Sequence, residues 1–505
     1  MLAWTIYLSF AGALIEALLP KGKAAPARWF ALAVAVAGLA LAVQGFIAGM
    51  GPNHAGRTVL VDVPWVPTMG IHYLLAADGI SRVLVLLTGL AAVAGVLFSW
   101  NIELRTNEFF AFFLALIGGV YGVFLSFDLF LLFVFYEIAI VPKYFLIAIW
   151  GSTRREYAAM KLALYSFVGS AMVLIGLLGA YAASGNQSTG LVALSHANFP
   201  VSFQMWAFPL VFVGFGILAG LWPFHAWAPT GHVAAPTAAS MLLAGVVMKL
   251  GAYGCLRVAI GLFPRGLDPW GFSIIGIGSW RDVFAILAVV GIVYGALVAL
   301  AQTDFKFVIG YSSVSHMGFV LLGLMTLNQI GMTGAVLQMF SHGIIAGLLF
   351  AIVGRIVYER THTRQLAELE TMHLSRRIPF AAWAFVVAGI ASMGLPGFSG
   401  FVAEFQVLVG AWIAKPWWTL AAGVGIVIGV AYTWRALQKA FFGDAPQTAH
   451  GLEQEIAHPF APITWPEVTG TALLAGVSLF VGLYPRILLD AIEPAVKALL
   501  AGGGR

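Results

Sequence analysis

The stretch LLFVFYEIAIVPKYFLIAIWG, residues 131–151, places one carboxylate, Glu137, inside an apolar run long enough to cross a bilayer. A charge near the centre of a membrane helix costs roughly 2.5–3.5 kcal/mol on insertion scales, so it faces the protein interior and often marks an ion or proton route. Two further charges lie in the same setting, Lys249 in SMLLAGVVMKLGAYG and Glu404 in MGLPGFSGFVAEFQVLVGAW. These three stretches predict membrane helices that carry functional charges.

The composition of the whole chain agrees with that prediction. Of the 505 residues, 61% are hydrophobic and only 9% are charged, whereas soluble domains have about 25% charged residues. This excludes an ordinary soluble enzyme and predicts a single membrane domain over residues 1–505. The net charge of +5 is dispersed over short loops and does not indicate nucleic-acid binding. The single cysteine, Cys255, excludes an internal disulfide and a cysteine-cluster metal site.

The apolar runs predict an all-α integral membrane protein. A membrane-spanning helix needs about 20 apolar residues, and about 14 runs approach that length. The first run has no basic residues before it, so we interpret it as a membrane helix and not as a signal peptide. The runs cover residues 3–19, 28–49, 80–99, 108–126, 128–150, 157–184, 205–228, 235–262, 282–302, 305–326, 331–357, 379–412, 416–441 and 465–490.

Two of these helices are predicted to be broken. The seventh run leads into WPFHAWAPTGHVAAPTAAS with three prolines, and the twelfth contains SMGLPGFSG. Proline removes a backbone donor and clashes with the preceding turn, and paired interruptions indicate inverted repeats around a transport site. We therefore expect two inverted five-helix repeats, 108–262 and 282–441, broken at spans 7 and 12. The alternative is that the prolines are simple kinks.

The Lys and Arg residues predict the orientation. Loops on one side of the predicted helices hold more of them, including Arg154, Arg155, Arg376 and Arg377. Such loops face the cytoplasm. We therefore expect both chain termini on the outer, periplasmic side of a bacterial inner membrane.

Several longer strings resemble the antiporter-like subunits of respiratory complex I, and among them the chain M type, the counterpart of mitochondrial subunit 4. The resemblance runs from about residue 78 to the C-terminal tail, and Glu404 is its most specific feature because related types usually carry Lys there. The strings are DLFLLFVFYEIAIVPKYFLIAIWG, WPFHAWAPTGHVAAPTAAS, MKLGAYGCLR, AQTDFKFVIGYSSVSHMGFVLLG, QMFSHGIIAGLLF, YERTHTR, GLPGFSGFVAEF and LFVGLYPRILLDAIEPAV.

This resemblance implies a proton path of two half-channels joined by a polar axis at the membrane centre. By motif match, Glu137 is the carboxylate at the start of the path, Lys249 the central lysine and Glu404 the terminal group, with His316 and His342 linking them. The residue types fit, since burial raises the pKa of a carboxylate and lowers that of a lysine, toward neutral pH. Each also has a structural alternative, such as tethering helices or capping freed backbone groups.

The chain departs from the family in the seventh span. Relatives carry a lysine five residues before the proline of the P-x-H-x-W motif, where this chain has Leu218, and an Asp where it has Thr230. Glu137 thus lacks the partner whose charge modulates its pKa. Lys143 looks like a poor substitute because six residues along a helix point it to a different face. We expect His225 to be the stand-in.

The ion pair expected from Asp304 and Lys306 is assigned a structural role, because the two lie at a predicted loop where exposed pairs contribute little. The chain has no cysteine cluster for iron–sulfur ligation and no dinucleotide fingerprint. It is therefore expected to hold no cofactor itself, with flavin and iron–sulfur clusters in partner subunits. The expected partners are the lipid bilayer and the chain L and chain N types of antiporter-like subunit, in a hetero-oligomer.

The function implied is that of a proton-translocating subunit of a complex I-type NADH:quinone oxidoreductase. One alternative is a subunit of a cation/proton antiporter of the Mrp type or of a membrane-bound hydrogenase. The other is a structural spacer that holds the membrane arm together without moving protons. The sequence leaves the electron donor, the quinone type, the choice of H⁺ over Na⁺ and the stoichiometry open.

Overall fold

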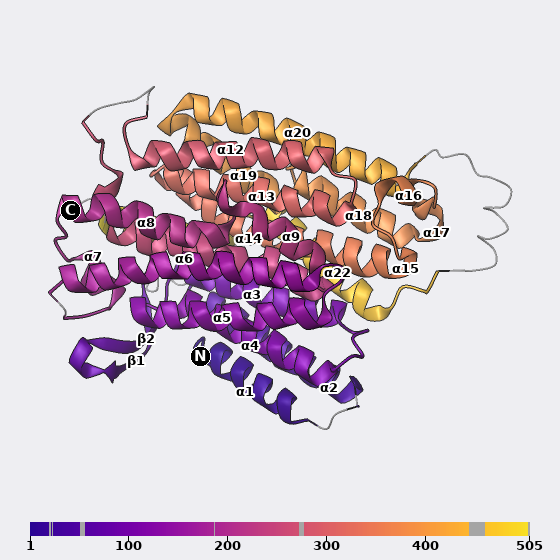
Figure 1. Ribbon diagram of the computed structural model, residues 1–505, viewed down its shortest axis with the longest axis horizontal. Coiled ribbons are helices and arrows are strands. Elements are labelled where there is room, and N and C mark those ends of the chain that lie inside the picture. The colour runs from indigo at the N-terminus through magenta and orange to yellow at the C-terminus, as the bar shows by residue number, and fades with distance from the viewer. Residues whose placement is uncertain are drawn as a thin grey trace.

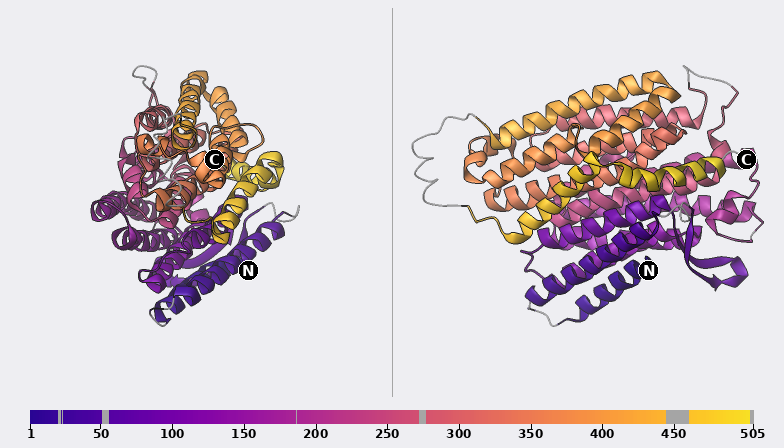
Figure 2. Two further views of the ribbon diagram at one scale, coloured as in Figure 1. Left: turned by 90° about the vertical axis from the view of Figure 1, so that its right-hand side faces the viewer. Right: turned by 180° about the vertical axis from the view of Figure 1, so that it is seen from behind.

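A computed structural model describes residues 1–19, 22, 24–50, 56–185, 187–271, 277–443 and 460–502. The helices run side by side in one elongated bundle (Figure 1), with α1 and α2 at one edge and α20 at the opposite edge. The C-terminal helices pass along the back of the bundle (Figure 2). The long helices are α1 Trp4–Leu18, α2 Ala24–Ala48, α3 Gly79–Phe98, α4 Thr106–Leu125, α5 Leu129–Trp150, α6 Arg155–Ala183, α8 Val201–Ala219, α12 Trp280–Ala301, α13 Phe305–Met325, α14 Gln329–Ala351, α20 Pro416–Phe441, α22 Trp465–Leu483 and α23 Arg486–Gly502.

The prediction of an all-α membrane protein is confirmed. Twelve helices in the described ranges are long and apolar enough to cross a bilayer, and three more apolar helices are shorter. The number 14 itself stays a prediction, because it depends on how these shorter helices are counted. So does the division into inverted repeats 108–262 and 282–441.

The helices differ in how far other helices enclose them. In α20 and α2, 28% and 33% of an apolar 18-residue stretch is buried within the protein. In the helical segments 237–260 and 329–361, 100% of the corresponding stretch is buried. Outer helices therefore present apolar side chains toward lipid, in keeping with their composition. The two enclosed helices carry Lys249 and His342, which places these side chains in the protein interior.

Both predicted helix breaks are present. α8 ends at Gly220, whose φ is +83°, and the chain continues through a single turn into α9, Trp227–Ala234. Helix α18, Pro379–Ser392, is separated from α19, Ser399–Ala414, by a segment containing Gly394 at φ +73°. A positive φ is strained for residues with a Cβ, so glycine allows the turn.

The helix that carries Lys249 is more irregular than predicted. Residues 237–260 begin as α10, Thr237–Leu242, and include α11, Met248–Gly254. Wider π-helical turns occupy Leu243–Val247 and Cys255–Ile260 on either side of α11. Such turns are rare and occur mostly at functional sites.

The segment between α2 and α3 forms a β-hairpin, which the sequence analysis did not predict. Strand β1, Thr58–Val66, pairs antiparallel with β2, Ile71–Ala77, around a turn at Pro67–Met69. Beside it, the backbone N–H of His72 donates to Asp128, the N-cap of α5. The hairpin thus lies beside the start of α5, at one corner of the bundle (Figure 1).

Candidate proton-conducting axis

Lys249 lies at the centre of the site. Its side chain has no exposed surface, and its Nζ donates to the carbonyl oxygen of Ala244 and lies 2.8 Å from Nδ1 of His342. Ala244 belongs to the π-helical turn before α11. The buried amine is therefore satisfied by a backbone carbonyl and an imidazole. Neither of these two contacts is with a carboxylate.

Glycines allow this contact. Helix α14 approaches the π-helical turn so closely that a Cβ added to Gly343 would lie 2.6 Å from the carbonyl oxygen of Gly245. Real Cβ atoms essentially never come within 3.0 Å of another heavy atom. Since His342 precedes Gly343 in the chain, the absence of a side chain at this crossing brings its imidazole to Lys249.

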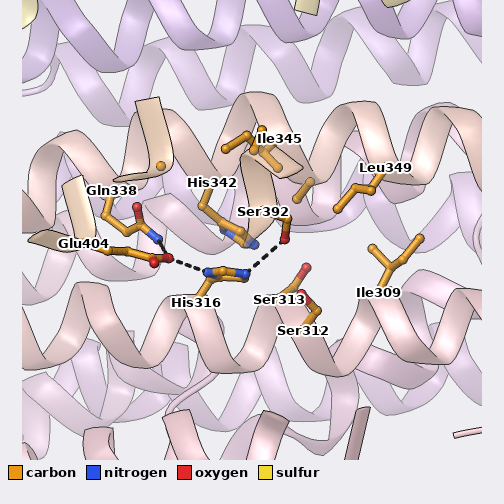
Figure 3. A pocket seen from close by; sticks show the side chains of 13 residues that line it. Ile309, Ser312, Ser313, His316, Gln338, His342, Ile345, Leu349, Ser392 and Glu404 are labelled. Atoms are coloured by element: carbon orange, nitrogen blue, oxygen red, sulfur yellow. Dashed lines mark hydrogen bonds and ion pairs between the residues drawn. The ribbon is translucent and has the colours of Figure 1, made fainter. Parts of the chain in front are cut away.

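The axis continues from His342 to the second broken helix. The imidazole rings of His342 and His316 are stacked, with centroids 5.5 Å apart. Nδ1 of His316 lies 2.8 Å from Oε1 of Glu404, and its Nε2 lies 3.3 Å from the hydroxyl oxygen of Ser392. The amide of Gln338 donates to the same Glu404 oxygen at 2.9 Å. Figure 3 shows Glu404, His316 and Ser392 joined in one row beneath His342.

These side chains line a cavity with a volume of about 10 Å³, enough for about one water molecule. It lies between α13, α14, α18 and α19, and its polar lining includes both histidines, Gln338 and Glu404. Four of the six residues predicted for the site, Lys249, His342, His316 and Glu404, are thus brought together in one line. Their roles remain to be tested.

Glu137 lies apart from this line, on α5. It is half-buried, and the charged groups and hydroxyls that act on it are Lys143 and Ser170. Lys143, which the sequence analysis expects to point to a different face, is buried, and its charge acts on Glu137. Pro142 lies between them inside α5 and supplies no backbone N–H to the helix.

The sequence analysis expects His225 to substitute for the missing partner of Glu137. Among the described residues, no contact between His225 and Glu137 supports this expectation. His225 lies in the turn between α8 and α9, with its ring 5.2 Å from that of Tyr294 and 6.4 Å from that of Tyr311. Lys161 is the charged group that acts on it. His225 therefore faces α12 and α13, while Leu218 is buried in α8.

The expectation that the Asp304–Lys306 pair is exposed is wrong for the lysine, while its structural role stays a prediction. Asp304 caps α13 and pairs with Arg364 at 3.3 Å. Lys306 is only 3% exposed, and its Nζ donates to the carbonyl oxygen of Ala235 at 3.1 Å. Helix α13 begins at Phe305, as predicted, so Lys306 lies in its first turn, where it contacts the Ala235 carbonyl. It lines a cavity of about 160 Å³ together with Ser152, Thr237 and other residues at that end of the bundle.

Sequence reasoning also missed His232. Its ring is fully buried in α9, neither nitrogen has a hydrogen-bond partner among the described residues, and the charges of Lys249 and Lys306 both act on it. The signal was available: His232 is the second histidine of the interrupted seventh span, WPFHAWAPTGHVAAPTAAS.

Comparisons with known proteins agree with this geometry. Residues 126–429 match the family described as NADH:quinone oxidoreductase/Mrp antiporter, TM. The chain is 35% identical to NADH-quinone oxidoreductase subunit M of Rhodobacter capsulatus, covering 99% of this chain and 96% of that protein. It is 34% identical to NAD(P)H-quinone oxidoreductase chain 4 1 of Synechococcus elongatus, over 98% of this chain and 90% of that one.

Two solved structures have the same fold. A chain of respiratory complex I from Thermus thermophilus superposes with a TM-score of 0.85 at 26% identity, covering 100% of both chains. A chain of the Mrp complex from Dietzia sp. superposes with a TM-score of 0.82 at 21% identity, covering 99% of this chain and 97% of that one, a level that supports the fold alone. Because the family spans more than half of the chain and relatives cover nearly all of it, the protein belongs to the NADH:quinone oxidoreductase/Mrp antiporter family of membrane subunits, alongside the subunit M and chain 4 proteins.

Proposed function

We propose that this chain is a proton-translocating membrane-arm subunit of a complex I-type NADH:quinone oxidoreductase. The observation that carries the proposal is the line of titratable side chains from Lys249 through His342 and His316 to Glu404. Intramembrane ionisable residues that face the bundle interior mark proton relays. The relatives are named as subunits of NADH-quinone oxidoreductases, which favours this proposal over an Mrp-type antiporter or hydrogenase subunit.

Proton uptake is proposed at the cavity that reaches Lys306. This cavity lies at the end of the bundle with Tyr358 and Glu359, near the loops rich in Lys and Arg. From Lys306 the next titratable group is His232, which experiences the charges of both Lys306 and Lys249. The order Lys306, His232, Lys249 therefore leads from this end to the centre of the bundle.

Transfer along the axis follows from the contacts. The Lys249 ammonium can pass a proton to Nδ1 of His342 at 2.8 Å, which leaves a neutral amine and a protonated imidazole. The cavity between the two histidines has room for about one water molecule to bridge their rings. His316 can then protonate Glu404 through the 2.8 Å contact. Gln338 holds the receiving oxygen in place by donating to it.

The chain would act within an assembly. We propose that flavin and iron–sulfur clusters lie in partner subunits, that the neighbours in the membrane are chain L and chain N types of subunit, and that the chain works as part of the oxidoreductase and translocase. We further propose that the protein lies in a bacterial inner membrane with both termini on the periplasmic side, since the loops richer in Lys and Arg lie at the other end.

Glu404→Gln in the assembled complex tests the proposal. Glutamine keeps the shape and can accept hydrogen bonds but does not titrate, so we expect intact assembly, loss of most proton translocation in proteoliposomes and slower quinone reduction. Glu493→Gln, a change on the exposed side of α23, is the matched control and should pump normally. An assembled Glu404→Gln complex that pumps at the unmutated ratio would support the spacer alternative, and sodium-dependent transport would support the antiporter alternative.

A further inference from the structure

Three polar side chains follow Lys249 toward the end of the bundle opposite the Lys306 cavity. Tyr253 lies four residues after Lys249 and Arg257 four residues after Tyr253. Residues four apart share one face of a helix, and the Arg257 guanidinium lies 5.3 Å from the centre of the Tyr253 ring. Asp78, the N-cap of α3, forms an ion pair with Arg257. Beyond this pair is a cavity of about 190 Å³ lined by Asp78 and Arg257.

The cavity brings that end of the bundle close to the central lysine. Eight residues separate Lys249 from Arg257, a rise of about 12 Å along a helix. A proton on Lys249 thus has two ways to go: sideways to His342, or along its own helix toward this cavity. The second would join both faces of the membrane through one lysine and dissipate the gradient.

We propose that Asp78, Tyr253 and Arg257 form a seal that stops protons on Lys249 from reaching this cavity, so that they leave only along the His342 axis. The inference rests on the proposed proton relay and adds to it the group that makes the relay one-directional at its centre.

The proton of Tyr253 is held in place. Its hydroxyl donates to the carbonyl oxygen of Phe124 at 3.1 Å, at the end of α4, and lies 3.2 Å from the hydroxyl of Ser81. The side chain is fully buried. Passing a proton onward would require the hydroxyl to break its bond to Phe124 inside the bundle, where Ser81 is the other hydrogen-bonding contact found among the described residues.

The ion pair beyond Tyr253 is unsuited to proton exchange. A guanidinium does not release its proton in proteins. Both Asp78 oxygens are engaged, Oδ1 with the backbone N–H of Ser81 at 2.9 Å and Oδ2 with Arg257. Burial alone would raise the pKa of Asp78, but the charge of Arg257 and the hydrogen bonds from Arg257 and Ser81 together outweigh it, and the pKa lies below its ordinary value. The carboxylate therefore stays ionised and does not take up a proton.

Aromatic packing and positive charge strengthen the barrier. The Arg257 guanidinium is held over the rings of both Tyr253 and Phe127, 5.2 Å from the latter. Arg57 lies 5.7 Å from the centre of the same Phe127 ring and lines the cavity. Arg82, one turn into α3, acts on Asp78 electrostatically. Three arginines near one carboxylate give this end of the cavity a net positive charge, which opposes the approach of a proton.

The test is passive proton permeability. The assembled complex is reconstituted in proteoliposomes, a pH gradient is imposed without NADH, and its decay is followed with an internal pH dye. We expect Arg257→Gln and Asp78→Asn to speed the decay severalfold and to lower the proton-to-electron ratio, while NADH-driven electron transfer persists. Arg486→Gln breaks an exposed ion pair with Asp490 at the start of α23, away from the cavity, and should leave the decay unchanged.

Two further variants keep the inference testable if those two assemble poorly. Arg257→Lys keeps a positive charge but introduces an amine that can release its proton, so it should leak; Lys249→Ala added to Arg257→Gln should restore a slow decay, because the leak begins at Lys249. An unchanged decay in assembled Arg257→Gln and Arg257→Lys would overturn the seal. Slower pumping without a leak would also overturn it, because the same residues would then form an exit route. Failure of the relay itself is distinguishable, since it appears as normal pumping in Glu404→Gln.

Discussion

At the scale of single residues, the unusual feature is a lysine on α5 in place of one on α8. Lys143 is buried, its amine has no hydrogen-bond partner among the described residues, and the carboxylate that acts on it is Glu137. Leu218 occupies the position where, by the resemblance, the antiporter-like subunits carry a lysine. We therefore propose Lys143 as the positive partner of Glu137, the place that the sequence analysis gave to His225.

Lys143→Met tests this assignment. Removing the positive charge leaves Glu137 without its electrostatic partner, so we expect proton-coupled turnover to fall about tenfold, equivalent to about 1.4 kcal/mol. Restoring a lysine in the double variant Lys143→Met, Leu218→Lys should recover turnover. Lys497→Met, at an exposed position of α23, serves as the control. Full activity in Lys143→Met would contradict the assignment.

Lys306 is the second residue whose role the structure changes. If it takes up protons, Lys306→Gln should slow pumping about tenfold, and Lys306→Arg should not rescue it because arginine does not release its proton. If it only anchors the Ala235 carbonyl, Lys306→Arg should restore activity. Proton uptake is measured in proteoliposomes, with Lys439→Gln, which removes a partly exposed ion pair with Glu370, as the control.

At the scale of elements, the crossing of α14 and the π-helical turn at Leu243–Val247 sets the geometry of the axis. Gly343→Ala would place a Cβ 2.6 Å from the carbonyl of Gly245, so the two segments must separate. Overpacking of this kind costs about 1–3 kcal/mol. We therefore expect a lower thermal stability and a weakened Lys249–His342 contact.

The measurement is the proton-to-electron ratio together with the melting temperature of the complex. Gly423→Ala on α20, where an added Cβ meets nothing within 4 Å, should change neither. A Gly343→Ala complex that melts normally and pumps at the unmutated ratio would show that the crossing does not control the relay.

Much of this architecture could be predicted because membrane physics leaves few choices. Apolar length predicts the spans, and Pro and Gly predict the breaks after Ala219 and Ser392. Intramembrane charges predicted Lys249 and Glu404, which the structure joins through His342 and His316.

The errors have local causes. The helix start at residue 305 was predicted correctly, but Lys306 was expected to be exposed because the sequence gives no signal that Ala235 packs against this first turn. The attraction between Lys143 and Glu137 was not expected, because the argument from helix angles leaves out the reach of electrostatic attraction in a protein interior. The π-helical turns and the β-hairpin have no strong signal in a single sequence, since they depend on the segments packed against them.

At the scale of the whole molecule, the segment 237–260 connects two cavities at opposite ends of the bundle. Thr237 lines the cavity with Lys306, and Arg257 lines the cavity with Asp78. Lys249 lies between them and is the point from which the His342 axis leaves sideways. This arrangement, open toward Lys306 and closed at Arg257, is what a relay needs to move protons without leakage.

The proton-to-electron ratio of Lys249→Ala, Glu404→Gln and their double variant tests the central claim most directly. If the two residues belong to one relay in series, each single variant should lower the ratio, and the double variant should lower it no further than the more severe single one, because non-additivity reveals groups that act as a unit. The claim is contradicted if both assembled single variants translocate protons at the unmutated ratio, or if the losses in the double variant add up independently.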